Sequence, residues 1–266
     1  MTSPGEAAGR RDAEASDRIL LHADIVVALM RRDLQSRFGH NVLGYAWTFV
    51  APLAWFAAIY FAFWLLGRTS PVYTDFVTFV LSGLTPYIAF RYVISSITRS
   101  TRHARGVIIF PSVTREHAIV GAAILEWISI VIVYAVVALA NYLAYGEFEM
   151  ANGLHFLVGV GLAWALGVSC AYMFDALARV NETFYDLPNV LLRPTVFLSA
   201  VFFVANELPN SVLDVLKWNP LLHAVEYARD GLLFHYDSRV ASVSYVLLWI
   251  AGFALAGFII GRWRSR

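Results

Sequence analysis

The stretch VLGYAWTFVAPLAWFAAIYFAFWLL at Val42–Leu66 contains no charged side chain and is apolar along almost its whole length. A helix that crosses the hydrocarbon core of a bilayer needs about 20 consecutive apolar residues. This stretch is long enough, so the sequence predicts a transmembrane helix here and places the chain among membrane proteins.

Five stretches further along the chain share this length and apolar character. They are Phe76–Ser96, Ala118–Tyr145, Gly153–Leu177, Leu187–Val204 and Ser242–Gly261. The overall composition agrees, because 59% of the residues are hydrophobic, only 15% are charged and the mean hydropathy is +0.62, whereas soluble domains have about 25% charged residues. We therefore predict an all-α membrane protein with six transmembrane helices.

Two segments precede the first span. Residues 1–14 are polar and predict a disordered tail, and residues 15–38 predict an amphipathic interfacial helix, because apolar residues recur near helical spacing with arginines between them. The N-terminus has no apolar h-region followed by a small-residue cleavage site, so we expect no cleaved signal peptide. Residues 39–266 then form one six-span domain.

Arginines indicate the orientation in the membrane. They cluster before the first span, in the turn after the second and in the C-terminal tail, whereas the turn after the third span has Glu147 and Glu149 and neither Lys nor Arg. Because cytoplasmic loops are enriched in Lys and Arg, we expect both termini in the cytoplasm.

The segment Ala205–Val240, between the fifth and sixth spans, is too long and too apolar for a simple turn. It also contains prolines and charged residues, among them Pro209, Pro220, Glu226, Arg229 and Asp230. Short re-entrant helices buried against protein would reconcile these features, because backbone at membrane depth must be hydrogen-bonded. A loop that lies on the lipid headgroups is the alternative.

Several functions are excluded or disfavoured by the sequence. A P-loop needs Gly-Lys-Ser/Thr, and the only lysine, Lys217, is in no such motif, so any ATP is hydrolysed by another chain. The net charge of +1 does not suggest nucleic-acid binding, and the single Cys170 excludes an intrachain disulfide and a Cys-rich metal site. No histidine is placed to pair with Ser82, which disfavours a membrane hydrolase. We expect no cofactor or metal on this chain.

Three groups of residues resemble a known family. The first is RDLQSRF at 32–38 with LGYAW at 43–47 and APL at 51–53; the second is GLTPYIAF at 83–90; the third is WNPLLHAVE at 218–226, followed by Arg229. In order and spacing they resemble the ABC-2 type permeases that export O-antigen, teichoic acid and capsule. LGYAW and Leu125-Glu126 are most similar to the capsule branch, whereas the turn Phe110–Glu116 departs from the proline-rich sequence usual there.

The resemblance implies a homodimer in the bacterial inner membrane with two separate ABC ATPase subunits, which bind ATP and Mg. It implies that the first and fifth spans enclose a channel through which a lipid-linked polysaccharide, capsular in the leading hypothesis, moves from cytoplasm to periplasm. O-antigen or teichoic acid export is the alternative within this mechanism. Periplasmic or outer-membrane export proteins would be further partners. An ion-coupled secondary carrier is a different hypothesis, for which Glu126 is the best intramembrane acid.

Aromatic and basic side chains are the candidates for the channel wall. A pyranose ring has an apolar face that can lie on an aromatic ring while its hydroxyls stay hydrated, and a guanidinium attracts an anionic polymer. The candidates are Trp47, Trp55, Tyr60, Arg91, Arg193, Phe197 and Phe202. An aromatic belt at the membrane interface is the alternative for Trp47, and core packing is the alternative for Phe197 and Phe202.

Charges inside predicted spans need protein or water partners, because burying one costs about 2.5–3.5 kcal/mol. Arg91 and Glu126 both lie about 12 Å from the same edge of neighbouring antiparallel helices. We expect an ion pair between them, with a channel-facing Arg91 as the alternative. Arg193 presents the same choice, with Asp175 as its partner.

Two further sites follow from the resemblance. The turn after the second span would contact the ATPase, although an ordinary cytoplasmic loop would carry the same arginines; its candidates are Arg99, Arg102, Arg105, Ile108, Phe110 and Pro111. The segment before the last span would form a periplasmic gate from Pro209, Trp218, Asn219, Pro220, Glu226 and Arg229. The amphipathic N-terminal helix would be a second ATPase contact or a plain surface anchor.

Overall fold

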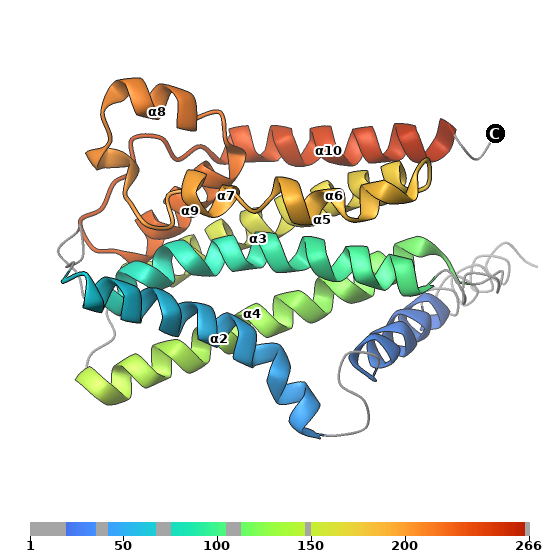
Figure 1. The fold of residues 1–266 in the computed structure, drawn as a ribbon, viewed down its shortest axis with the longest axis horizontal. Helices are drawn as coiled ribbons and strands as arrows, with labels where there is room; N and C mark the ends of the chain where they lie inside the picture. The colour runs from blue at the N-terminus through green and yellow to red at the C-terminus, as the bar shows by residue number, and fades with distance from the viewer. Residues whose placement is uncertain (1–19, 36–41, 68–75, 105–112, 147–149, 264–266) are drawn as a thin grey trace, which may run out of the picture.

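The computed structural model describes residues 20–35, 42–67, 76–104, 113–146 and 150–263, with the side chains of 42–49, 51, 104 and 145 left out. All regular elements in these ranges are helices, which confirms the all-α prediction. The predicted tail at 1–14 lies outside the described residues. Long helices run antiparallel and form a bundle (Figure 1).

Five long helices make up this bundle. They are α2 (Val42–Leu65), α3 (Phe76–Ala104), α4 (Arg115–Tyr145), α5 (Gly153–Ala178) and α10 (Val243–Trp263). Among the described residues, α3, α4, α5 and α10 are long and apolar enough to cross a membrane, and α2 contributes a shorter apolar stretch at Pro52–Leu65. The chain is therefore a multi-pass membrane protein by length and composition.

Side chains next to the helices explain where several of them begin and end. Asn152 Oδ1 accepts from His155 N at 3.1 Å and so caps the start of α5, and Asn219 Oδ1 accepts from Leu221 N at 3.0 Å at the start of α9. Such caps satisfy backbone N–H groups that have no partner inside the helix. Gly146 follows α4 with φ +77°, a left-handed conformation that glycine adopts without strain.

The predicted N-terminal helix is present at 20–35, and its predicted ends lie outside the described residues. Leu29 is buried against Ala118 of α4, whereas Leu20 and Leu21 are exposed. His22 Nδ1 lies 2.8 Å from His117 Nε2, a second contact between this helix and α4. The exposed apolar side suits a membrane surface.

The expected continuous fifth span at Leu187–Val204 was wrong. The structure has η1 (Glu182–Tyr185), α6 (Leu187–Leu191) and α7 (Thr195–Leu198), and the chain continues in non-helical conformation to η2 (Ala205–Glu207). Pro194 has no N–H and cannot continue α6 into α7 as a regular helix. Ala200 then has φ +57°, a left-handed conformation that ends α7. Among the described residues the spans are thus five long helices and one broken segment.

Short helices do precede the last span, as predicted. They are α8 (Asn210–Leu216) and α9 (Pro220–Leu232), at the end of the bundle opposite the C-terminus (Figure 1). α9 is almost entirely buried and packs against α5, α3 and α10. The segment is therefore not a simple loop at α9. Whether α9 lies at membrane depth or at the level of the lipid headgroups stays a prediction.

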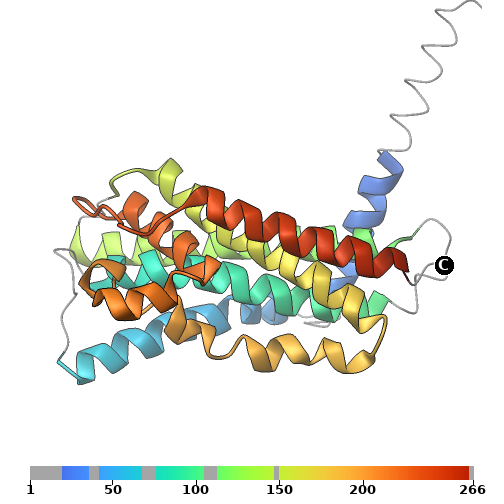
Figure 2. The ribbon, with the colours of Figure 1, turned by 90° about the horizontal axis from the view of Figure 1, so that it is seen from above.

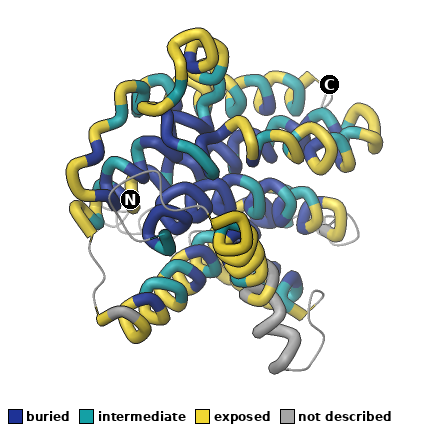
Figure 3. The backbone as a smooth tube through the Cα atoms, turned by 60° about the vertical axis from the view of Figure 1, so that its left-hand side comes forward, coloured by how far each residue is buried: buried dark blue, intermediate teal, exposed yellow. Residues whose placement is uncertain are grey.

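The core of the bundle is formed by α3, α5 and α9. α5 and α10 run side by side (Figure 2), yet most of α10 is exposed, as is one face of α4 (Figure 3). The exposed side chains of α10 are apolar and include Leu247, Leu248, Leu255, Phe258 and Ile259. A soluble protein rarely exposes an apolar surface of this extent, so lipid or another subunit covers this face.

Candidate functional site

A buried ion pair on α9 is the centre of the candidate site. Glu226 and Arg229 lie about one turn apart, both side chains are fully buried, and Arg229 Nη1 lies 2.6 Å from Glu226 Oε1. Removing two charges from water is costly unless further hydrogen bonds satisfy both groups. The other contacts of these two side chains therefore decide what the pair does.

The Arg229 guanidinium binds the stretch where the fifth predicted span loses its helix. Nη2 donates to the carbonyl oxygen of Ala200 at 2.6 Å, and Nη1 donates to that of Phe203 at 2.9 Å. Arg229 also contacts two residues of α3. Its Nε donates to Ser82 Oγ at 3.2 Å, and its guanidinium lies 5.0 Å from the centre of the Phe79 ring. Buried carbonyls outside a helix need partners, and Arg229 supplies them.

The Glu226 carboxylate accepts hydrogen bonds from the opposite side. Oε1 accepts from Ala205 N at 3.4 Å, and Oε2 accepts from Tyr236 Oη at 2.5 Å and from Ser238 Oγ at 2.9 Å. The pair thus links α3, the broken span, α9 and the loop after α9. We call this set the α9 hub; it consists of Ser82, Glu226, Arg229, Tyr236 and Ser238.

Two more side chains hold the same irregular segment at its ends. Asn219 Nδ2 donates to the carbonyl oxygen of Leu198 at 3.0 Å and to Ser199 Oγ at 2.9 Å. Arg239 Nη2 donates to the carbonyl oxygen of Ala205 at 2.9 Å and also to that of Leu208. The backbone at 198–208 is therefore fixed by side chains from α9 and from the segments on either side of it.

The predicted gate residues fall into two groups. Asn219, Glu226 and Arg229 meet at the segment 198–208, and Pro220 is the first residue of α9. Pro209 is exposed at the start of α8, and 70% of Trp218 is exposed, so neither belongs to the hub. That these residues form a gate stays a prediction.

Sequence reasoning missed several members of the hub. Ser82 was weighed only as a hydrolase nucleophile, and Tyr236 and Ser238 were not singled out. A Cβ on Gly83 would lie 2.7 Å from Arg229 Nη2 and 3.0 Å from the Val201 carbonyl oxygen, so no larger residue fits beside the hub. The available signal was a Glu and an Arg three residues apart in an apolar segment, which demand buried partners.

α9 also packs closely on the start of α5. A Cβ on Gly159 would lie 2.5 Å from the backbone of Ala228, and Asn152 N donates to the carbonyl oxygen of Gly231 at 2.7 Å. His155 Nε2 lies 3.7 Å from Asp230 Oδ2. Burial raises the pKa of the Asp230 carboxyl above its ordinary value, while His155 opposes this effect.

A groove follows one face of α3 toward the C-terminal end of the bundle. Its first part is a cavity of about 190 Å³ lined by Trp55, Tyr87, Ile88, Arg91, Tyr92 and Ser95. Its second part, about 140 Å³, is lined by Ser95, Thr98, Arg99, Arg102, Tyr185, Asp186 and Asn189. The α3 residues recur every three to four positions, as residues on one helical face do. We call this surface the α3 groove.

The expected ion pair between Arg91 and Glu126 is not formed between these two described side chains. Ser100 Oγ donates to the Ala118 carbonyl oxygen at 3.4 Å, so these two residues lie at the same level of the antiparallel helices α3 and α4. Eight residues back from Ser100 is Tyr92, and eight residues on from Ala118 is Glu126. Tyr92 rather than Arg91 is therefore level with Glu126. Arg91 is turned away by the rotation of about 100° per residue. Its Nη2 lies 3.4 Å from the Asn189 carbonyl oxygen, in the α3 groove.

The suggested pair between Arg193 and Asp175 is also absent between these described residues. The buried Asp175 carboxylate pairs with Arg115 Nη1 at 2.9 Å and with Arg179 Nη2 at 3.3 Å. Arg193 is exposed between α6 and α7. Two cations already surround Asp175, so it does not need a third.

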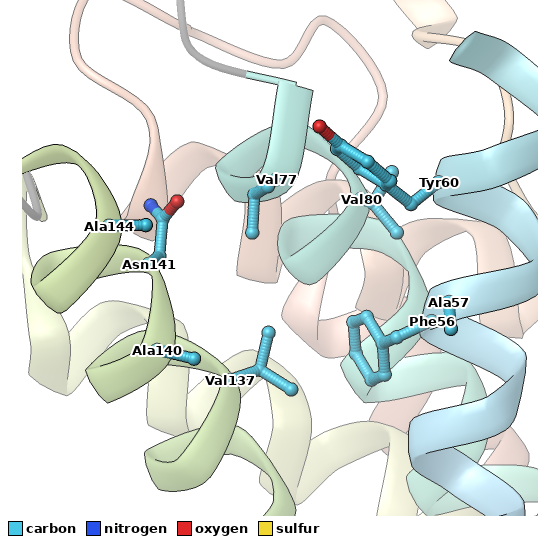
Figure 4. A pocket seen from close by; sticks show the side chains of 9 residues that line it. All are labelled: Phe56, Ala57, Tyr60, Val77, Val80, Val137, Ala140, Asn141 and Ala144. Atoms are coloured by element: carbon cyan, nitrogen blue, oxygen red, sulfur yellow. The ribbon is translucent and has the colours of Figure 1, made fainter.

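The candidate channel aromatics lie in different surroundings. Trp55 is 47% exposed and lines the α3 groove, and Phe197 is 68% exposed with its ring 5.7 Å from that of half-buried Phe202. Tyr60 borders a separate apolar cavity of about 260 Å³ between α2, α3 and α4, together with Phe56 (Figure 4). The Trp47 side chain lies outside the described residues.

The predicted ATPase-contact residues are described only in part. Arg99 and Arg102 lie in the last turns of α3 and line the α3 groove. Arg102 Nη2 pairs with Asp186 Oδ1 at 3.0 Å, and its guanidinium lies 4.9 Å from the centre of the Tyr185 ring. Arg105, Ile108, Phe110 and Pro111 lie outside the described residues.

Known proteins match most of this chain. The polysialic acid transport protein KpsM of Escherichia coli is 28% identical over 237 residues, which cover 89% of this chain and 90% of KpsM. The capsule polysaccharide export inner-membrane protein CtrC of Neisseria meningitidis is 26% identical over 249 residues, or 87% and 88% of the two chains. The O-antigen export system permease protein RfbA of Klebsiella pneumoniae is 24% identical over 254 residues, or 87% and 90%. The sequence pattern of the ABC-2 type transporter family matches residues 25–233, and this chain belongs to that family.

Proposed function

We propose that this chain is the transmembrane subunit of an ATP-driven exporter that moves a lipid-linked polysaccharide from cytoplasm to periplasm. The names of its relatives favour a capsular polysaccharide as the substrate. Family membership and the names of relatives such as KpsM and CtrC support this substrate class. The observation that carries the proposal is the α3 groove, because its lining suits a sugar chain.

The chemistry of the groove fits weak binding at many points. Trp55 and Tyr92 offer aromatic rings on which the apolar face of a sugar can lie, and Ser95 and Thr98 offer hydroxyls for hydrogen bonds. A long polymer must be released at each step, so shallow contacts serve it better than a deep pocket. Arg91 adds a cation for any carboxylate or phosphate on the chain.

A second copy of the chain would complete the channel. Trp55, Phe61 and Trp64 on α2 are exposed, as are Leu191 and Phe197 on the broken fifth span. An exposed apolar and aromatic surface beside a polar groove suits an interface between subunits. The homodimer would then enclose the α3 grooves of both copies.

The proposed orientation puts both termini in the cytoplasm and α8 and α9 on the periplasmic side. Arginines concentrate at the C-terminal end of the bundle, where Arg102 and Arg115 flank the turn 105–112. ABC ATPase subunits would bind at that end and would carry the ATP and Mg. The α9 hub would then lie near the exit.

The first test is purification of this chain together with the P-loop ATPase encoded beside its gene, followed by ATPase assays in nanodiscs. We expect a stoichiometric complex whose hydrolysis responds to the glycolipid, and we expect no response when the lysine of the ATPase P-loop is replaced by alanine. A stable chain that captures no ATPase would contradict the proposal. Proton-dependent transport without ATP, lost in Glu126→Gln, would instead support a secondary carrier.

O-antigen export by the same mechanism is the second candidate, because RfbA aligns over 90% of its own length. Capsular and O-antigen glycolipids offered in parallel to the nanodisc complex would separate the two. The glycolipid that raises ATP hydrolysis identifies the substrate class.

A further inference from the structure

The apolar cavity between α2, α3 and α4 is separate from the α3 groove, and α2 divides the two. Trp55 lines the groove, whereas Phe56 and Tyr60 line the cavity. Successive residues of a helix differ in direction by about 100°, so α2 presents different sides to the two spaces. The proposed function does not use this cavity, whose volume is about 260 Å³. We call it the α2–α4 cavity.

The cavity lies at the end of the bundle where α4 ends. Its lining residues on α4 are Val137, Ala140, Asn141 and Ala144, which have the spacing of one helical face, and α4 ends at Tyr145. From Val137 to Ala144 the helix rises about 10 Å, whereas the hydrocarbon of one leaflet is about 15 Å deep. The cavity therefore fits within the single leaflet next to the C-terminal end of α4.

Polar groups lie at one end of the cavity only. Figure 4 shows the Tyr60 hydroxyl and the Asn141 amide at the end nearer Ala144, whereas Phe56 and Val137 lie further along α2 and α4. The other labelled side chains of the lining are hydrocarbon. A leaflet has the same arrangement, because polar headgroups lie above apolar acyl chains. The cavity therefore matches one acyl chain in polarity and in direction.

The cavity opens on a surface that suits lipid. Ala57 and Ala140 line it and are exposed. Beside it, the outer face of α4 is apolar, with Leu139 58% and Leu143 75% exposed. Apolar cavities exclude water, and one of about 150 Å³ stays dry and binds benzene. The larger α2–α4 cavity is continuous with this face, so the hydrocarbon that fills it is an acyl chain of the surrounding bilayer.

We propose that the α2–α4 cavity binds one acyl chain of a bilayer phospholipid from the leaflet next to the C-terminal end of α4. The headgroup lies above Tyr60 and Asn141, and the chain runs down to Phe56 and Val137. The bound chain supports α2 on the side away from the α3 groove. Only the identity of the leaflet rests on the proposed function, whose orientation makes it the periplasmic one.

The test uses the full chain in nanodiscs of phosphatidylethanolamine and phosphatidylglycerol. A fraction of the phosphatidylglycerol carries a photoreactive diazirine in its acyl chain, and mass spectrometry after illumination identifies the labelled residues. Phe56 and Val80 line the cavity and are 7% and 4% exposed, so lipid that only surrounds the protein does not reach them. Leu139 is exposed and reports the surrounding lipid in the same sample.

Two variants fill the cavity from exposed positions on opposite walls. They are Ala140→Phe on α4 and Ala57→Phe on α2. The matched control is Ala135→Phe, because Ala135 is also an exposed alanine of α4 but does not line the cavity. Should one of the filling variants fail to accumulate, the other still decides the question.

We expect the wild-type chain to be labelled at Phe56 and Val80. In Ala140→Phe, this label should fall about tenfold relative to the label on Leu139, which corresponds to about 1.4 kcal/mol or the burial of about two methylene groups. Ala135→Phe should be labelled like wild type. Label confined to exposed residues of the wild-type chain would overturn the proposal, and a second copy of the chain seated on the cavity would give that result.

Label on Phe56 and Val80 that neither filling variant reduces would also overturn it. The experiment needs no ATPase and no glycolipid, so it is independent of the proposed function. A chain that binds phospholipid in the cavity but captures no ATPase would contradict the proposed function alone. A chain that exports with its ATPase but shows no label in the cavity would contradict this inference alone.

Discussion

Replacing Arg229 with methionine removes a buried cation and keeps a side chain of similar length. The carbonyl oxygens of Ala200 and Phe203 lose the donors that the structure gives them, and the buried Glu226 carboxylate loses its counter-charge. Glu226 retains the hydrogen bonds from Tyr236 and Ser238. The damage is thus concentrated on the irregular segment after α7.

The magnitude follows from these three groups. Removing one partner of a buried ion pair costs about 3–5 kcal/mol, and each buried carbonyl left without a donor costs about 1–3 kcal/mol. Together they amount to about 5–11 kcal/mol, which approaches the whole stability of a typical domain. We expect Arg229→Met to yield little folded protein. Adding Glu226→Gln removes the unpaired carboxylate, so the double variant should be more stable than Arg229→Met alone.

The assay is size-exclusion chromatography after heating in detergent, which gives the amount of monodisperse protein and an apparent Tm. Arg239→Met is the matched control, because Arg239 also donates to backbone carbonyls of this segment but is exposed. It should change the apparent Tm by only a few degrees. An Arg229→Met protein that is monodisperse and melts within about 3 °C of wild type would refute the reasoning. So would a double variant that loses the sum of both single effects.

Three further predictions use the same structure. Gly83→Ala should destabilise the protein by about 1–3 kcal/mol in the same melting assay, because the added Cβ would lie 2.7 Å from Arg229 Nη2. The control Gly252→Ala should melt like wild type, because a Cβ added there would meet no neighbouring side chain or helix within 4 Å. Trp55→Ala and Arg91→Gln should reduce surface polysaccharide in cells without reducing the amount of protein in the membrane; loss of protein in proportion to export would contradict a role in the groove. Cys170 is the only native cysteine in the sequence, and it is buried. A membrane-impermeant thiol reagent should therefore label Val215→Cys on α8 but not Thr183→Cys on η1 in intact spheroplasts. The reverse labelling pattern would overturn the proposed orientation.

Local properties of the sequence were sufficient for the membrane class and the family. Hydropathy acts over about 20 consecutive residues, so the apolar runs predicted α2, α3, α4, α5 and α10. The ends differ by a few residues, except that α3 continues to Ala104, well beyond the predicted end at Ser96. The amphipathic spacing likewise predicted the helix at 20–35. The order of three short motifs indicated the ABC-2 type transporter family, which the match over residues 25–233 confirmed.

The broken fifth span shows where local reasoning fails. Its hydropathy predicts a helix, and Pro194 alone would allow a kinked one. The chain instead turns at Ala200, where Arg229 donates to the carbonyl oxygens of Ala200 and Phe203 and Asn219 donates to that of Leu198. A regular helix would have satisfied such carbonyls within itself. Those partners lie 20 or more residues away along the chain, so the sequence of the span does not contain the reason for its shape.

The charged residues make the same point at the level of single side chains. Depth along a helix follows from counting residues, and the sequence correctly brought Arg91 near the level of Glu126. The direction of a side chain changes by about 100° per residue, so an error of one position was enough to replace an ion pair with a groove-facing arginine. The sequence determined which residues had to be buried in a membrane, because that depends on neighbours along the chain. Only the tertiary structure decided which polar groups met, because Ser82 and Arg229 are separated by 147 positions and meet through the packing of α3 against α9.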